Sequence, residues 1–184
     1  YPEGLAQARE LDYASRRVTS IEINGTFYRT PSRDSFRRWA AATPEDFLFA
    51  LKAPRFAVNR RVLAEAGESI ARFFASGVTE LGHKLGPVLW QLAPTKTFDP
   101  EDIARFLALL PEEADGLRLR HALEVRHPSF LVPEFAALAA AHGVAVVCAD
   151  SDKYPAIADV TGDFIYARLQ RTVEHEPAGY PPAL

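Results

Sequence analysis

The stretch from Pro133 to Asp150 reads PEFAALAAAHGVAVVCAD and contains the helix-then-strand pattern that decides the fold. Apolar residues recur at helical spacing from Phe135 onward, Pro133 suits the first turn of a helix, and Gly143 is typical of the residue just after one. The run Val144–Asp150 is apolar until its last residue, as in a strand buried on both faces. The stretch therefore predicts a helix followed directly by a buried strand.

The same pattern extends along the rest of the chain. Six apolar runs of strand length occur at Val18–Asn24, Phe47–Lys52, Pro87–Leu92, Ala122–Arg126, Val144–Asp150 and Phe164–Leu169. Segments with helical spacing separate them around 36–40, 62–74, 103–110 and 135–142. Regular alternation of buried strands and helices predicts an α/β fold with a parallel sheet, either doubly wound or closed into a barrel.

Two features favour a TIM-type (β/α) barrel. The sequence contains no Gly-rich turn of the kind that binds nucleotides in doubly wound sheets. Most of the apolar runs end in polar residues, as expected when several strands contribute to one site at a barrel mouth. A full barrel has about 250 residues, whereas this chain has 184. We therefore expect one domain over residues 1–184, a barrel without its first and last strands.

Composition narrows the class of protein. The chain has 21 basic and 24 acidic residues and a pI near 6.0, which does not fit the broad basic surface of a non-specific nucleic-acid binder. One cysteine excludes an internal disulfide framework. No opening apolar segment or long apolar run predicts export or a membrane span. A cytoplasmic protein with no membrane partner is expected.

Strand alternation predicts a polar pocket. Because side chains alternate between the two faces of a strand, Glu22 and Asn24 lie opposite Ile21 and Ile23. Applied to every run, the rule predicts a converging set of three acids, three bases and four neutral groups. They are Glu22, Glu124, Asp150, Lys52, Arg126, Arg168, Asn24, Tyr28, Gln91 and Tyr166.

Two interpretations of this set remain open, a structural ion-pair network and a catalytic pocket. Desolvating so many charges is costly, which favours a pocket that binds something polar. Catalytic roles are expected for Glu22, Lys52, Glu124 and Asp150. Either glutamate could act as general acid or base if burial raises its pKa, with Asp150 orienting the base. Lys52 could be a base, an electrophile or a Schiff-base amine, although an ion pair with an acid is favoured.

The remaining polar residues are candidates for binding. Arg126 and Arg168 could hold a carboxylate, a phosphate or sugar hydroxyls. The predicted substrate-binding residues are Asn24, Tyr28, Arg55, Gln91, Arg126, His127, Tyr166 and Arg168. His127 precedes Pro128 and suits a structural cap equally well.

A metal site is a weaker possibility. Glu22, Glu124, His127 and Asp150 have side chains that bind divalent ions. Neighbouring basic side chains would repel such an ion, and no metal-binding or cofactor motif occurs in the sequence. The pattern leaves the metal and the cofactor undetermined.

Several blocks of sequence resemble one protein family. They are Ile21–Tyr28 with Pro31, Trp39, Phe49–Arg55, Leu85–Leu92, Leu123–Phe130, Ala149–Ser151 and Tyr166–Leu169. Together they resemble the domain-of-unknown-function 72, or YecE-like (UPF0759), family of TIM barrels with no characterised role. The resemblance implies a strand before Tyr1 and another after Leu184. A loose relation to sugar isomerases, at the level of the fold, also suggests testing for a metal.

Three functions compete at this stage. The first is an enzyme that uses acid/base chemistry on a small polar metabolite, sugar-like or anionic, at the barrel mouth. The second is a non-catalytic binder of such a molecule at the same pocket. The third and least favoured is a nucleic-acid-processing protein that uses Arg55, Arg60 and Arg61. The sequence does not indicate an oligomeric state.

Overall fold

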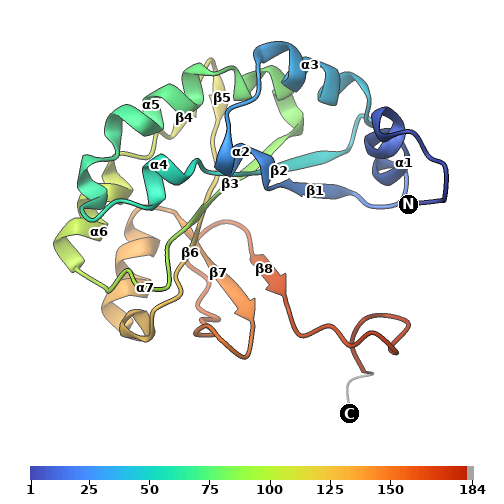
Figure 1. Ribbon diagram of the computed structural model, residues 1–184. Helices are drawn as coiled ribbons and strands as arrows, with labels where there is room; N and C mark the ends of the chain where they lie inside the picture. Colours follow the sequence, from blue (N-terminus) through green and yellow to red (C-terminus); the bar gives the residue numbers. More distant parts are fainter. Residues whose placement is uncertain (182–184) are drawn as a thin grey trace.

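Six parallel strands form one curled sheet in the computed structural model, which describes residues 1–181 (Figure 1). The strands are β1 (Ser20–Ile23), β2 (Leu48–Lys52), β3 (Leu85–Gln91), β6 (His121–Glu124), β7 (Ala145–Asp150) and β8 (Tyr166–Leu169). They neighbour one another in chain order, and every pair is parallel. This order confirms the predicted parallel α/β fold and is that of a barrel, not of a doubly wound sheet. Within the described residues the sheet ends at β1 and β8, so it forms an incomplete barrel.

Four helices of nine residues lie around the outside of the sheet (Figure 1). They are α3 (Arg33–Ala41), α5 (Gly67–Ala75), α6 (Pro100–Ala108) and α7 (Pro133–Ala141). Two begin at side-chain caps, since Ser32 Oγ accepts from the Ser35 amide and Asp99 accepts from two amides of the first turn of α6. Gly143 follows α7 with a positive φ of 62°. The helix start at Pro133 and the stop at Gly143 are therefore confirmed, whereas the segment with helical spacing from residue 62 becomes an α-helix only at Gly67.

Shorter elements complete the structure. There are three short helices, α1 (Glu10–Ser15), α2 (Gly25–Tyr28) and α4 (Arg55–Val58), among the described residues. There are also four 3-10 segments, η1 (Gln7–Arg9), η2 (Leu63–Glu65), η3 (Val78–Lys84) and η4 (Pro128–Phe130). A small antiparallel hairpin, β4 (Glu113–Ala114) with β5 (Leu117–Arg118), was not expected from the sequence. Its turn contains Asp115-Gly116, both at positive φ, a dipeptide typical of tight hairpins. Within the described residues, no helix has the length and apolar character needed to span a membrane.

The hydrophobic core lies between the sheet and the helices. Outward-facing strand residues such as Phe49, Leu51 and Trp90 are buried there. A smaller apolar cluster, formed by Leu89, Ala122 and Val147 and flanked by Phe164 and Tyr166, lies on the other face of the sheet, inside the curl. The carboxyl ends of the strands lie beyond this inner cluster, which supports the polar residues there.

Gly86 permits close contact between two strands. The register of β2 and β3 shifts between Phe49 and Leu51, and a Cβ on Gly86 would lie 3.0 Å from the carbonyl oxygen of Phe49. We expect Gly86→Ala to lower the free energy of unfolding by about 1–3 kcal/mol, because backbone must move to make room. Chemical denaturation measures this loss. Gly67→Ala is the control, since its Cβ would make only an ordinary 3.6 Å contact with Leu109; equal losses in both variants would contradict the explanation.

His121 couples the stability of the core to pH. The Trp90 indole N–H donates to His121 Nδ1 at 3.1 Å, and His121 Nε2 donates to the carbonyl of Pro111 at 2.8 Å. Burial lowers the pKa of His121 despite the bond to Pro111. A base whose folded pKa lies below its unfolded value stabilises the fold fully above the unfolded pKa, about 6.5, and this stability is lost as the pH falls.

We therefore expect the free energy of unfolding to decrease below about pH 6.5, more steeply in the wild type than in His121→Gln. Denaturation series between neutral and mildly acidic pH test this difference. Parallel curves for the two proteins would show that His121 does not titrate on unfolding.

Candidate functional site

Glu124 occupies the centre of a polar cluster at the carboxyl ends of the strands. Its side chain has no exposed surface. Oε2 accepts from Gln91 Nε2 and from Arg168 Nη1, both at 2.7 Å, and Oε1 accepts from Arg126 Nε at 2.7 Å. Gln91 ends β3 and pairs in register with Glu124 at the end of β6, whereas Arg168 comes from β8. Three segments of the chain thus converge on one carboxylate.

Glu22 and Arg168 extend this cluster across the interior of the sheet. Arg168 donates from Nη1 to Glu124 and from Nη2 to Glu22, the latter at 3.1 Å. The Tyr166 hydroxyl donates to Glu22 at 2.7 Å. Since Glu22 lies on β1 and the other two on β8, side chains link the two edge strands although their backbones do not pair. The predicted residues Glu22, Gln91, Glu124, Arg126, Tyr166 and Arg168 are therefore brought together.

The electrostatics of Glu124 differ from the expectation. Burial alone would raise its pKa, but the hydrogen bond from Gln91 and the two arginines outweigh burial and hold the pKa below its ordinary value. Glu124 is therefore ionised at neutral pH, and the raised pKa on which the predicted general-acid role depended is not found in this structure. Burial and Glu22 raise the pKa of Tyr166, which remains a hydrogen-bond donor.

Lys52 forms no ion pair, contrary to the favoured interpretation of the sequence. It ends β2 and is half-buried, and its Nζ lies 4.6 Å from the centroid of the Phe27 ring. Among residues 1–181 no carboxylate lies within ion-pairing distance of it. Burial and the positive charges of Arg168 and Arg126 lower the pKa of Lys52, and the two glutamates only partly oppose this.

Asp150 faces away from the cluster, which corrects the predicted orientation of β7. Val147 pairs with Tyr166 and packs inside the curl, and residues paired in parallel strands face the same side. Asp150 comes three residues later and therefore faces outward, where it binds Arg171 and the Tyr180 hydroxyl. The hydrogen bond from Arg171, followed by that from Tyr180, lowers its pKa. A role in orienting a base at Glu124 is thus incompatible with its position.

The other predicted binding residues lie around this cluster without bonding to it. Asn24, Tyr28 and Arg55 are exposed, with Arg55 stacked on Phe56 at 5.1 Å. His127 acts as a cap, because its Nδ1 accepts from the Ser129 amide at 3.1 Å at the start of η4. The alternative cap role suggested by its place before a proline is the one observed.

Two residues beside the cluster were missed by the sequence analysis. The Thr26 hydroxyl is buried and lies 2.6 Å from the carbonyl oxygen of Lys52 and 2.8 Å from that of Ile23, so it ties α2 to both strand ends. The Tyr154 ring stacks on the Arg126 guanidinium, with 4.3 Å between its centroid and Cζ. Thr26 lies between Asn24 and Tyr28, which the sequence analysis did select as binding residues. No sequence motif distinguishes Tyr154 from the other residues of its loop.

The residues present do not fit a metal centre. Within the described part of the chain, no three His, Cys, Asp or Glu side chains are placed to hold an ion together. Of the four candidate ligands, Glu22 and Glu124 are bound by arginine, Asp150 faces outward and His127 caps a turn. The four candidate residues therefore do not form a set of ligands for one ion.

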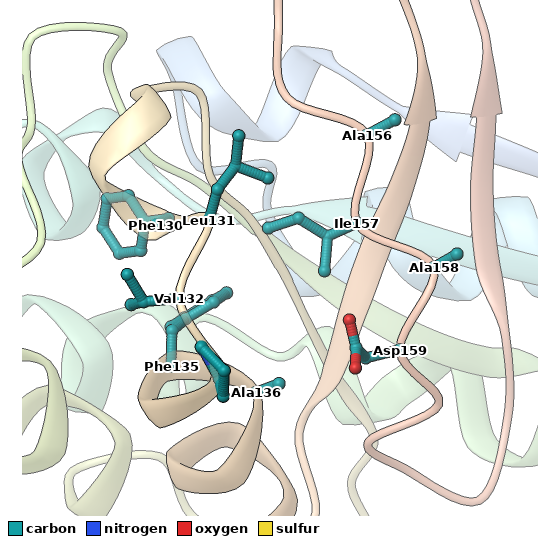
Figure 2. Close-up of a pocket in the computed structure, with 10 residues that line it drawn as sticks. Phe130, Leu131, Val132, Phe135, Ala136, Ala156, Ile157, Ala158 and Asp159 are labelled. Carbon is teal, nitrogen blue, oxygen red and sulfur yellow. The ribbon is translucent and has the colours of Figure 1, made fainter.

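A separate cavity of about 270 Å³ lies beside the start of α7 (Figure 2). Phe130, Val132 and Phe135 line one side of it, and Ile157 and Asp159 lie on the other. Its lining is apolar apart from Asp159. Such a surface offers few groups to orient a polar molecule, so the cluster around Glu124 remains the candidate site.

Removing the charge of Glu124 should destabilise the protein. We expect Glu124→Gln to lower the free energy of unfolding by about 3–5 kcal/mol, because two part-buried arginines would lose their shared anion. The pKa of Glu124 is lowered in the folded state, so this contribution is present above the ordinary glutamate pKa of about 4.3 and fades as the pH falls below it.

Urea denaturation at neutral and acidic pH checks both statements. Glu68→Gln is a matched control, since Glu68 forms an exposed pair with Arg72 within helix α5. If the two variants unfold alike at neutral pH, Glu124 does not hold the cluster together.

Comparisons with known proteins agree with this architecture. The family described as protein of unknown function DUF72 matches residues 1–183. The UPF0759 protein YunF of Bacillus subtilis is 26% identical over 140 residues, which cover 73% of this chain and 49% of YunF. A DUF72 protein from Thermotoga maritima superposes with a TM-score of 0.71 at 26% identity, covering 96% of this chain and 71% of that one. One from Enterococcus faecalis gives 0.69 at 21%, covering 84% and 66%.

The chain thus spans about half the length of the curated relative and about two thirds of the structural ones. The two structural relatives share its fold. Because the family match extends over residues 1–183, the chain belongs to the DUF72 family of proteins of unknown function.

Proposed function

We propose that this protein is an enzyme that binds a small anionic or sugar-like metabolite at the cluster around Glu124 and catalyses proton transfer there. The observation that carries the proposal is the unpaired Lys52 beside a buried network of fixed charges. Burying a charge costs about 5 kcal/mol per ion even after the protein relaxes around it, and apolar side chains of similar volume would avoid that cost. A polar ligand gives the network a purpose beyond packing.

The charges in the cluster favour an anion. Glu22 and Glu124 are matched by Arg126 and Arg168, so a protonated Lys52 adds a net positive charge. Arg126 uses Nε for Glu124, and among the described residues its Nη2 has no hydrogen-bond partner. An anionic substituent could therefore bind Arg126 and Lys52 without displacing either glutamate.

The proton-transfer role falls to Lys52 in this proposal. A lysine with a lowered pKa exchanges a proton near neutral pH more readily than an ordinary one. Glu124 serves as a fixed anion that orients the arginines, and Tyr166 stays protonated. Closure of the sheet into a full (β/α) barrel between β1 and β8 is part of the proposal, because it would enclose the site at the barrel mouth.

Thermal-shift measurements test the site directly. A ligand that binds only the folded state stabilises it by about 2.7 kcal/mol at a concentration 100-fold above its Kd. We expect sugar phosphates or small carboxylates to raise the melting temperature, with or without Mg²⁺, Mn²⁺ or Zn²⁺. Lys52→Gln should weaken the shift, whereas Lys153→Gln, at an exposed position, should leave it unchanged.

The same measurement distinguishes the competing functions. NMR can detect proton exchange or chemical conversion of the stabilising compound, and either result would identify an enzyme. Binding without turnover would identify a sensor. No shift with any compound would leave the cluster as a structural ion-pair network. A salt-dependent shift with single-stranded oligonucleotides alone would point to nucleic acid instead.

A further inference from the structure

The four lysines of the chain differ in how their amines are bonded, and Lys52 is the exception among the buried ones. Lys84 is buried and its Nζ donates to the carbonyls of Ala40 at 2.7 Å and Thr43 at 2.9 Å. Lys96 Nζ donates to Asp102 and to a backbone carbonyl. Lys153 is exposed. Lys52 is half-buried, and among residues 1–181 its amine has no hydrogen-bond acceptor.

The orientation of β7 explains why this amine is unpaired. Had Asp150 faced inward, the cluster would have contained three acids for three bases. Asp150 instead binds Arg171, and each remaining glutamate already accepts from an arginine. Arg168 and Arg126 also repel a proton on Lys52. These contacts lower the pKa of Lys52 and so increase the fraction of neutral amine, whose lone pair a nucleophile needs.

The backbone of Lys52 is held in place while its amine stays free. Its carbonyl lies within hydrogen-bonding distance of the buried Thr26 hydroxyl, at 2.6 Å. Phe27 follows Thr26 in the chain, and the centroid of its ring lies 4.6 Å from Lys52 Nζ. The ring thereby covers one side of the amine. Arg168 and Arg126 lie near enough to lower the pKa of Lys52, and Nη2 of Arg126 has no hydrogen-bond partner among the described residues. The amine thus lies at the end of a buried strand, near a guanidinium that could bind an anion.

We infer that Lys52 Nζ forms an imine with the carbonyl carbon of a small aldehyde or ketone that also carries a carboxylate or phosphate. The neutral amine adds to the carbonyl carbon, and a proton passes from nitrogen to oxygen to give a carbinolamine. The hydroxyl then takes a proton from solvent and leaves as water, which gives the protonated imine. No oxidant or reductant is needed, since amine and carbonyl give only imine and water.

The protonated imine explains how proton transfer would be assisted. Its positive charge withdraws electrons from the neighbouring carbon of the substrate, so a C–H or C–C bond there breaks more easily. The protonated imine carries the same single positive charge as the ammonium form of Lys52. This inference rests on the proposed function, because it requires that the anionic part of the substrate bind at Arg126 while its carbonyl group meets Lys52.

Borohydride trapping tests the inference. The protein is incubated separately with glyoxylate, pyruvate and dihydroxyacetone phosphate, reduced with sodium borohydride, and analysed by intact mass and peptide mapping. We expect one reduced adduct per chain, at Lys52 and before any adduct at the exposed Lys153, since the lowered pKa of Lys52 leaves more of its amine neutral. Lys153→Arg should leave trapping unchanged.

Lys52→Arg separates this inference from the proposed site. Arginine keeps a positive charge but lacks a nucleophilic amine, and circular dichroism and a melting curve verify that the variant folds. Loss of the adduct with retention of the thermal shift supports the imine. A thermal shift in the wild type without an adduct at Lys52 overturns the imine and leaves the site standing. Absence of both, or equal labelling of Lys52 and Lys153, overturns both.

Discussion

The buried carboxylate of Glu124 is the interaction on which the inside of the sheet depends. It accepts hydrogen bonds from β3, from β8 and from the segment after β6. One of its partners, Arg168, also binds Glu22, so the two edge strands of an incomplete barrel are linked through side chains. A charge without exposed surface persists only when it is fully paired, and here the pairing also connects β8 to β1, β3 and β6.

The same pairing determines which group is left to react. Two arginines satisfy two glutamates, and the third acid predicted for the cluster lies on the opposite face of β7. Lys52 therefore has no partner for its amine within the described residues, although the buried Lys84 and the half-buried Lys96 both have hydrogen-bond acceptors. The cluster thus contains two acidic and three basic side chains, whereas the sequence had predicted three of each.

Because the family has no described reaction, the function of this protein is inferred from the residues of the site. The relatives share the singly wound parallel sheet at TM-scores near 0.7. In such sheets the carboxyl ends of the strands meet at one rim, which is where catalytic groups gather in barrel enzymes. The cluster lies at that rim, with Thr26 and Phe27 from the turn after β1 positioned against the end of β2.

Local patterns in the sequence determined the elements, and tertiary pairing determined the chemistry of the site. The strands, the caps at Ser32 and Asp99 and the stop at Gly143 could be predicted because each depends on neighbouring residues. The direction of Asp150 could not, because Val144–Ala149 is apolar on both faces and its alternation gives no phase. Only the pairing of Val147 with Tyr166 sets that phase. The pKa of Glu124 likewise depends on donors brought together by folding, since burial alone would have shifted it the opposite way.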